Sequence, residues 1–207
     1  MRLFLSSYRL SDDPGRLTAL LRTRRPVAIV ANATDMFSGP ARAGCVHSEV
    51  TMLAELGLES EEIDLRAYFG APERLARDLE RFELVWVRGG NTFVLRTALA
   101  LSGADRVLTG LVRRDSVVWG GYSAGACVLA PDLRGIELVD DPGEVRDCYG
   151  TEPMWEGLDL VGYAVVPHFR SEYLGGAEVE RLAERYREEG VPHRTLRDGE
   201  AIVVDGP

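Results

Sequence analysis

Residues 116–126 read Ser-Val-Val-Trp-Gly-Gly-Tyr-Ser-Ala-Gly-Ala, so an apolar run leads directly into small residues around Ser123. The run SVVW shows no alternation with polar residues, which is typical of a parallel strand covered by helices on both faces. A stretch compatible with a helix follows the serine. Gly121 and Gly125 carry no Cβ, so they permit a sharp turn close to a packed strand. The segment therefore predicts a strand, a turn and a helix in succession.

Apolar runs of the same kind recur along the chain and alternate with helical patterns. They predict strands at 2–6, 26–31, 62–65, 83–88, 116–119, 163–166 and 201–204. Between them, apolar side chains share a helical face at Val46, Val50, Leu53 and Leu56, and again at Val179, Leu182, Ala183 and Tyr186. Such alternation forms βαβ units, which close into a mostly parallel, doubly wound sheet with helices on both faces. The predicted fold class is α/β.

Length and composition are typical of one globular domain. With 207 residues, 45% hydrophobic and 28% charged, the chain accommodates one full core but not two ordinary domains with a linker. We therefore expect a single domain over residues 1–207. The longest stretch without clear periodicity, residues 140–158, is the best candidate for a lid over a binding site.

The charge of the chain disfavours some classes of partner. A formal net charge of −9 repels nucleic acid and anionic membranes unless a basic patch is concentrated somewhere. The short cluster of Arg22, Arg24 and Arg25 follows Asp12 and Asp13 and is best interpreted as a solvated surface. We expect small molecules or copies of the same chain as partners, and neither nucleic acid nor membrane.

Cysteine usage points to a reducing compartment. Cys45, Cys127 and Cys148 are odd in number and lack C-x-x-C spacing, so they predict neither a disulfide framework nor a zinc site. The apolar stretch near the N-terminus is too brief for a signal peptide, and no run reaches eighteen apolar residues. The expected location is the cytoplasm.

The Gly-x-Ser-x-Gly pattern around Ser123 is typical of a nucleophile elbow. In this context the serine stands at the N-terminus of the following helix, where free N–H groups stabilise a developing anion. Ser123 is the candidate nucleophile. The alternative is a glycine-rich turn without chemistry.

A second glycine-containing loop, residues 88–93, follows another predicted strand and reads Arg-Gly-Gly-Asn-Thr-Phe. It lacks the G-x-G-x-x-G spacing of a dinucleotide site. We expect it to bring the N–H of Gly90 beside Ser123, so that this group and the N–H of Ala124 form an oxyanion hole. The alternative is a plain turn in which Asn91 caps the next helix.

His168 directly follows the predicted strand 163–166, and a strand end of this kind faces the ligand crevice of an α/β sheet. It is the candidate general base toward Ser123. His47 and His193 fall in a helical pattern and in a polar loop, and both are interpreted as incidental. The order nucleophile, acid, histidine then places the acid within residues 134–142.

That segment contains Glu137, Asp140 and Asp141, any of which has the chemistry to accept a hydrogen bond from Nδ1 of His168. No metal or organic cofactor is needed, because a serine, a histidine, a carboxylate and an oxyanion hole suffice for acyl transfer.

Three motifs, GGNTF, GYSAGA and PHF, resemble in order and spacing those of peptidase E, a family of serine dipeptidases. The resemblance covers roughly residues 80–170 and implies a fold like that of class I glutamine amidotransferases. In those enzymes the elbow normally carries cysteine, so Ser123 disfavours amidotransfer. The resemblance further implies hydrolysis of short peptides, including dipeptides with N-terminal aspartate, and a homodimer.

The remaining site residues carry over less directly from the family. An aspartate two residues before a proline maps to Asp140, whereas counting from the serine leads to Glu137. Both stay candidates for the acid. Asn91 and Arg170 are candidate substrate-binding residues, since a guanidinium suits a substrate carboxylate; for Arg170 the alternative is an ordinary surface arginine.

Two other functions fit the same motifs. One is a catalytically silent small-molecule binding protein that keeps the fold and its crevice. The other is an α/β-hydrolase esterase, which shares the elbow and the triad order, although the chain is short for that fold and has no HGGG-type loop.

Overall fold

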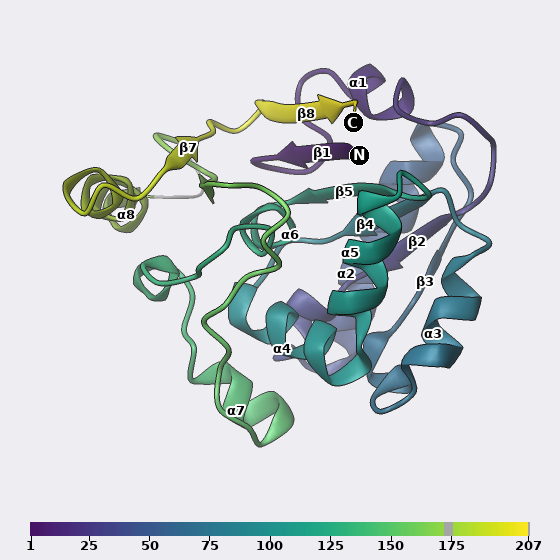
Figure 1. Cartoon of the computed structure of the whole chain (residues 1–207), viewed down its shortest axis with the longest axis horizontal. Coiled ribbons are helices and arrows are strands. Elements are labelled where there is room, and N and C mark those ends of the chain that lie inside the picture. The colour runs from purple at the N-terminus through teal and green to yellow at the C-terminus, as the bar shows by residue number, and fades with distance from the viewer. Residues whose placement is uncertain (172–175, 207) are drawn as a thin grey trace.

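A six-stranded sheet forms the centre of the computed structural model, which describes residues 1–171 and 176–206 (Figure 1). Its strands lie in the order β3-β2-β4-β5-β1-β8. Their bounds are β1 Arg2–Ser6, β2 Val27–Val30, β3 Ser60–Glu62, β4 Leu84–Val87, β5 Val118–Tyr122 and β8 Ala201–Asp205. All neighbours pair in parallel except β1 and β8, which are antiparallel. The predicted mostly parallel sheet is confirmed.

Helices cover both faces of this sheet. The helices of the described residues are α1 Gly15–Thr18, α2 Gly39–Glu55, α3 Pro72–Leu79, α4 Thr92–Ser102, α5 Ala104–Arg113, α6 Ala124–Cys127, α7 Glu144–Tyr149 and α8 Gly176–Glu188, with 3-10 turns η1 Asn32–Thr34, η2 Leu65–Tyr68 and η3 Ile136–Leu138. Successive residues of β4 point to opposite faces: Val85 packs in one core with Leu95 of α4, and Trp86 in the other with Leu53 of α2. Burial on both faces explains why the strand sequences lack alternation.

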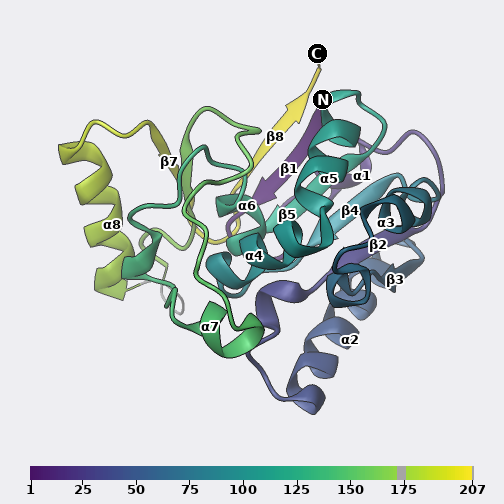
Figure 2. The same cartoon turned by 60° about the horizontal axis from the view of Figure 1, so that its bottom comes forward.

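The predicted strand 163–166 is present, but it lies outside the main sheet. This strand, β6 (Ala164–Val166), pairs in parallel with β7 (His193–Thr195) in a separate two-stranded sheet. The polar loop predicted around His193 is wrong, because His193–Thr195 forms β7. The sequence pattern missed β7 because its three residues, His-Arg-Thr, are polar and partly exposed. Figure 2 shows β7 and α8 beside the main sheet, where α8 packs with β6 in a third apolar core.

Two strand boundaries also differ from the predicted ones. The strand expected at 62–65 ends at Glu62, because the 3-10 turn η2 begins at Leu65. The strand expected at 116–119 extends to Tyr122. This extension passes through glycines, and a Cβ on Gly120 would lie 2.8 Å from the Trp86 ring. Tight packing on β4 therefore requires glycine there, although glycine is not a strand-forming residue.

The segment 140–158 contains the short helix α7 and is attached to the body of the protein. Tyr149 donates a hydrogen bond to Asp35, with 2.6 Å between Oη and Oδ2. Further on, the N–H of Leu158 donates to the carbonyl of Val128 at 2.8 Å. Closure of this segment as a lid stays a prediction.

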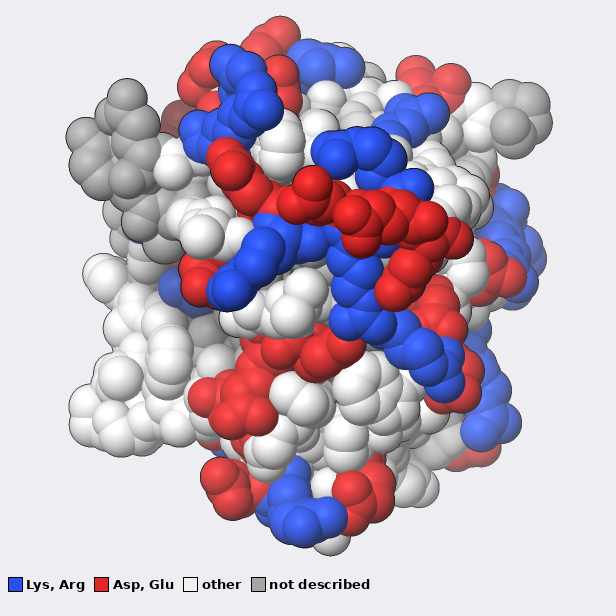
Figure 3. Space-filling view, turned by 90° about the vertical axis from the view of Figure 1, so that its left-hand side faces the viewer, with Lys and Arg blue, Asp and Glu red and all other residues white. Residues whose placement is uncertain are grey.

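The surface and the chain ends complete the description. The amino group of Met1 donates to the carbonyl of Gly206, so both ends of the described chain lie at one edge of the sheet (Figure 1). Arginine and acidic side chains interleave on the face shown in Figure 3. All three cysteines are free. In the described part of the chain, no helix is long and apolar enough to cross a membrane.

Candidate active site

Ser123 occupies a strained turn between β5 and α6. Its φ is 51° and its ψ is −117°, in a region that residues with a side chain rarely adopt. The surroundings hold the turn in place: a Cβ on Gly125 would lie 2.2 Å from the carbonyl oxygen of Val87, and one on Gly121 would lie 2.9 Å from the same atom. The predicted succession of strand, sharp turn and helix is confirmed.

A buried carboxylate fixes the end of the strand that leads into Ser123. Glu49 of α2 accepts hydrogen bonds from Tyr122 Oη and Trp86 Nε1, both at 2.8 Å. Arg88 Nε lies 3.1 Å from the same carboxylate and provides its counter-charge. Burial, followed by the charge of Glu49, raises the pKa of Tyr122, which therefore stays a neutral donor.

The loop after β4 lies directly against the serine. A Cβ on Gly89 would be 2.9 Å from the Cβ of Ser123. Gly90 has a φ of 152°, and a Cβ there would lie 2.2 Å from the carbonyl oxygen of Ala33, so only glycine fits without displacement. Among the described residues, the N–H groups of Gly90 and Ala124 have no hydrogen-bond acceptor. Both are therefore free to bind an oxyanion.

Asn91 has a structural task that uses its whole side chain. Its Oδ1 accepts from the N–H groups of Phe93 and Val94 at 2.9 and 3.0 Å, which caps α4. Its Nδ2 donates to the carbonyl of Asp141 and to Glu144 at 2.8 and 2.7 Å. An amide has two donors and two lone pairs, so no polar group of this side chain remains for substrate. Asn91 instead ties the loop after β4 to α7.

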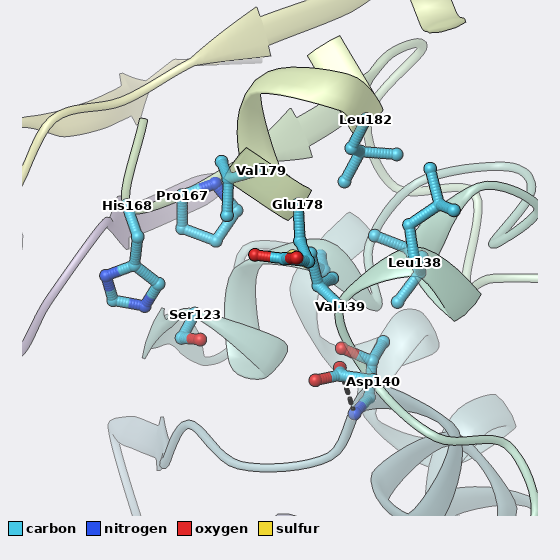
Figure 4. A pocket seen from close by; sticks show the side chains of 12 residues that line it. Ser123, Leu138, Val139, Asp140, Pro167, His168, Glu178, Val179 and Leu182 are labelled. Carbon is cyan, nitrogen blue, oxygen red and sulfur yellow. Dashed lines mark hydrogen bonds between the residues drawn. The ribbon is translucent and has the colours of Figure 1, made fainter. Parts of the chain in front are cut away.

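His168 follows β6 with a positive φ of 60°, which is unusual for a residue with a side chain. Its backbone N–H donates to Ser7 Oγ at 2.7 Å. Its Nδ1 lies 2.8 Å from Oδ1 of Asp198. Figure 4 shows Ser123 and His168 beside each other at one end of a pocket, with the opposite edge of the imidazole ring turned toward the serine. The hydrogen bond to Asp198 makes Nδ1 a donor and leaves Nε2 as the proton acceptor.

Asp198, which no pattern had suggested, lies in the turn between β7 and β8. Ser7 Oγ donates to its Oδ1 at 2.8 Å and so contacts both members of the pair. The order nucleophile, acid, histidine predicts an acid only between the serine and the histidine, and Asp198 lies after both. The available signal was an Asp-Gly turn, residues 198–199, directly before the last apolar run.

Neither predicted acid contacts His168. Glu137 accepts hydrogen bonds from the N–H of Gly135 at 2.5 Å and from Arg185 at 2.8 Å, so α8 holds it away from the imidazole. Asp140 accepts from the N–H of Thr92 at 2.8 Å. Burial raises the pKa of Asp140, and the negative charge of Glu144 adds to that effect.

The pocket beside Ser123 has a volume of about 310 Å³ (Figure 4). It is lined by Thr92, Ser123, Cys127, Ile136, Leu138, Val139, Asp140, Pro167, His168, Glu178, Val179 and Leu182. Arg170, a predicted substrate-binding residue, is not among them: its side chain is 61% exposed and its guanidinium lies over the Phe169 ring. Within the described residues, no group of three or more metal-ligating side chains is arranged to hold a metal ion.

Comparison with known proteins places the chain in a family. The model of Peptidase family S51 matches residues 17–207. The chain belongs to family S51. It is 33% identical over 165 residues to "Peptidase E" of Streptomyces coelicolor, and 27% identical over 165 residues to "Probable alpha-aspartyl dipeptidase" of Drosophila melanogaster. Each match covers 77% of the chain.

The chain spans less than two thirds of the length of these family S51 relatives, 64% of the Streptomyces protein and 65% of the Drosophila protein. A crystal structure from Listeria monocytogenes assigned to peptidase E matches with a TM-score of 0.80 at 22% identity, covering 99% of this chain and 94% of the other. A peptidase from an acI-B1 actinobacterium matches with a TM-score of 0.69 at 16% identity, covering 98% and 82%. These likenesses show a shared fold.

Proposed function

We propose that this chain is a serine peptidase that hydrolyses short peptides through an acyl-enzyme on Ser123. The observation that carries the proposal is the convergence of three strand ends on one pocket. Ser123 follows β5, Thr92 follows the loop after β4, and His168 follows β6 with its Nδ1 on Asp198; all three line the pocket. Membership of family S51 supports the same reaction class.

The proposed first step is attack on the peptide carbonyl. Ser123 Oγ forms a bond to the carbonyl carbon while Nε2 of His168 accepts the hydroxyl proton. The electron pair of the C=O double bond moves to oxygen, and the N–H groups of Gly90 and Ala124 bind this oxyanion. Asp198 accepts the Nδ1 hydrogen bond throughout, so it fixes the tautomer and stabilises the imidazolium.

The second half returns the site to its starting state. The C–N bond breaks as the oxyanion re-forms the carbonyl, and His168 gives its proton to the departing amine. An ester on Ser123 remains. Water then attacks this ester with His168 again as base, the acid product leaves, and Ser123 regains its proton. No further reactant is required.

The size of the pocket and the names of the relatives suggest the substrates to examine. A volume of about 310 Å³ lies at the lower end of the range for small-molecule pockets, which favours short peptides over folded proteins. The Drosophila relative is named an alpha-aspartyl dipeptidase, so dipeptides with N-terminal aspartate belong in the test set.

The test combines a covalent probe with a dipeptide library. A fluorophosphonate should label the wild-type chain at Ser123, and Ser123→Ala should lose both labelling and peptide cleavage. Labelling at another residue, or none, overturns the proposal. Thermal stabilisation by peptides without turnover supports a silent binding protein instead. Rapid p-nitrophenyl ester hydrolysis with peptides untouched supports an esterase.

A further inference from the structure

The pocket extends away from Ser123 and His168 along an apolar wall. Ile136, Val179 and Leu182 are 2%, 6% and 1% exposed, and Leu138 stands opposite α8 (Figure 4). The wall belongs to the same pocket as Ser123, so it is available to the side chain of a residue whose carbonyl lies at Ser123. The wall buries apolar surface and offers that side chain no hydrogen bonds.

The charged groups of the pocket are negative. Asp140 and Glu178 contribute carboxylates, and the described lining contains no arginine. Two arginines of α8 already pair with carboxylates: Arg181 donates to Glu178 and Arg185 to Glu137, both at 2.8 Å. A substrate carboxylate in this pocket therefore meets acidic side chains and no arginine of the described lining.

Asp140 has no cationic partner among the described residues of the pocket. Of the described groups, only Thr92 donates to its carboxyl, through the backbone N–H at 2.8 Å and through the side chain. A carboxylate lining an apolar pocket is costly unless a cation or further donors reach it. The α-ammonium group of a peptide N-terminus carries a positive charge and three donors, and it lies one bond from the Cα that bears the side chain.

We infer that the acylating residue of the substrate is a medium-sized apolar residue, such as leucine, whose free α-amino group pairs with Asp140. This inference rests on the proposed function, because it assumes that peptides acylate Ser123. It selects peptides with an apolar N-terminal residue over peptides that begin with aspartate.

The magnitude of the preference follows from like-charge repulsion. An N-terminal aspartate would bring its own carboxylate beside Asp140 and Glu178, whereas leucine would lie against Val179 and Leu182. Placing like charges side by side lowers a binding constant by several factors of ten. We therefore expect the kcat/KM of Leu-Ala to exceed that of Asp-Ala by about 100-fold.

The experiment measures kcat/KM for Leu-Ala, Asp-Ala, Lys-Ala and N-acetyl-Leu-Ala, with Ser123→Ala as the blank. Leu-Ala should be the best of the four substrates. Acetylation removes the ammonium charge, so N-acetyl-Leu-Ala should lose at least about 10-fold relative to Leu-Ala, in line with the strength of a charged hydrogen bond.

Two variants test the carboxylates. Asp140→Asn should raise KM for Leu-Ala about 10-fold and narrow the difference between Leu-Ala and its acetylated form. Asp141→Asn, an exposed neighbour outside the pocket, is the matched control. Glu178→Arg places a cation at the exposed start of α8. It should reduce the ratio of kcat/KM for Leu-Ala to that for Asp-Ala by about 10-fold. Glu188→Arg, at the far end of the same helix, is its control.

Four results overturn the inference, and none of them contradicts an acyl-enzyme on Ser123. Ser123-dependent cleavage of Asp-Ala in preference to Leu-Ala excludes an apolar specificity. A preference for Lys-Ala means that a basic side chain, not the α-amine, meets Asp140. Equal rates for Leu-Ala and its acetylated form exclude the ammonium contact. Labelling of Ser123 without cleavage of Leu-Ala excludes the substrate class. Absence of both labelling and cleavage refutes the proposed function itself.

Discussion

Asp198 and His168 form the contact on which the proposed chemistry depends. Their side chains are separated by 2.8 Å, although the residues lie 30 positions apart in sequence. Ser7, from the end of β1, donates to Asp198 and accepts from the backbone of His168, so three distant segments meet at this point. If Asp198 orients the imidazole, its charge matters more than its volume.

The corresponding prediction compares two isosteric variants. Asp198→Asn should lower kcat about 10³-fold or more, because an amide favours the wrong tautomer of His168. Glu137→Gln should stay near wild type, since Glu137 pairs with Arg185. The pH profile of kcat distinguishes a role of Asp198 in orienting His168 from a role in stability alone. Only the first role predicts that the shape of the profile changes in Asp198→Asn. Near-normal kcat in Asp198→Asn would remove Asp198 from the proposed triad.

A second prediction concerns the backbone of Gly90. Gly90→Ala would place a Cβ 2.2 Å from the carbonyl oxygen of Ala33 and forbid the φ of 152°. The loop must shift, which should cost about 1–3 kcal/mol of stability and at least about 10²-fold in kcat if the N–H of Gly90 binds the oxyanion. Denaturant unfolding and steady-state kinetics measure the two effects. Gly162→Ala, where a Cβ meets nothing within 4 Å, is the control.

Among the elements, α2 is joined to the sheet through a polar contact. Glu49 is 2% exposed and binds Trp86 of β4 and Tyr122 of β5. This contact holds the two strands at the level where Ser123 and the loop after β4 begin. The sequence pattern of α2 had indicated only its apolar face, because periodicity ranks residues by polarity and a buried carboxylate appears there as surface.

Removing this contact should be strongly destabilising. Glu49→Leu leaves Arg88 without its counter-charge. It also leaves the buried indole N–H of Trp86 and the buried hydroxyl of Tyr122 without an acceptor. The loss should be about 3–5 kcal/mol in urea unfolding, the usual cost of breaking a buried pair. Glu55→Gln, exposed at the end of the same helix, should change stability by less than about 0.5 kcal/mol. A small effect of Glu49→Leu would mean that the strand ends are held by packing alone.

At the scale of the whole molecule, an ion-pair network closes the carboxyl end of the sheet around β2 and β3. Arg42 donates to Asp35, and Asn32 and Arg66 both donate to Asp64. Burial opposes ionisation of Asp64, but the hydrogen bonds from Arg66 and Asn32 outweigh it and lower the pKa of Asp64 to about 2.

This network predicts how stability depends on pH. A carboxyl whose pKa is lower in the folded than in the unfolded state contributes stability above its unfolded value near 3.8, and that contribution is lost as pH falls toward about 2. The contribution of Asp64 is about 2 kcal/mol. Asp64→Asn should therefore reduce the dependence of the unfolding free energy on pH between pH 4 and about 2. Urea titrations at several pH values measure this dependence. Asp147→Asn, exposed on α7, should leave the slope unchanged.

The predicted homodimer belongs to the same scale and stays a prediction. Light scattering on the purified chain measures it directly.

Local patterns determined the parts of this protein that depend on neighbours in sequence. The apolar runs predicted seven strands, and six of the seven regions overlap one by two residues or more, because burial on two faces excludes polar residues from a continuous stretch. The seventh, 62–65, shares only Glu62 with β3. The elbow at Ser123 was equally readable, since a strained turn between a strand and a helix requires small residues at fixed offsets.

Only the tertiary structure decided which carboxylate faces His168 and that β6 pairs with β7. It also decided that the side-chain hydrogen bonds of Asn91 are all made within the protein, with α4, Asp141 and α7. The reason is physical. A hydrogen bond acts over about 3 Å, and the segments that bring Asp198 to His168 are joined only through the arrangement of β1, β6 and β8. Glu137 and Asp198 carry equivalent chemistry in the sequence, and the geometry of the folded chain distinguishes them.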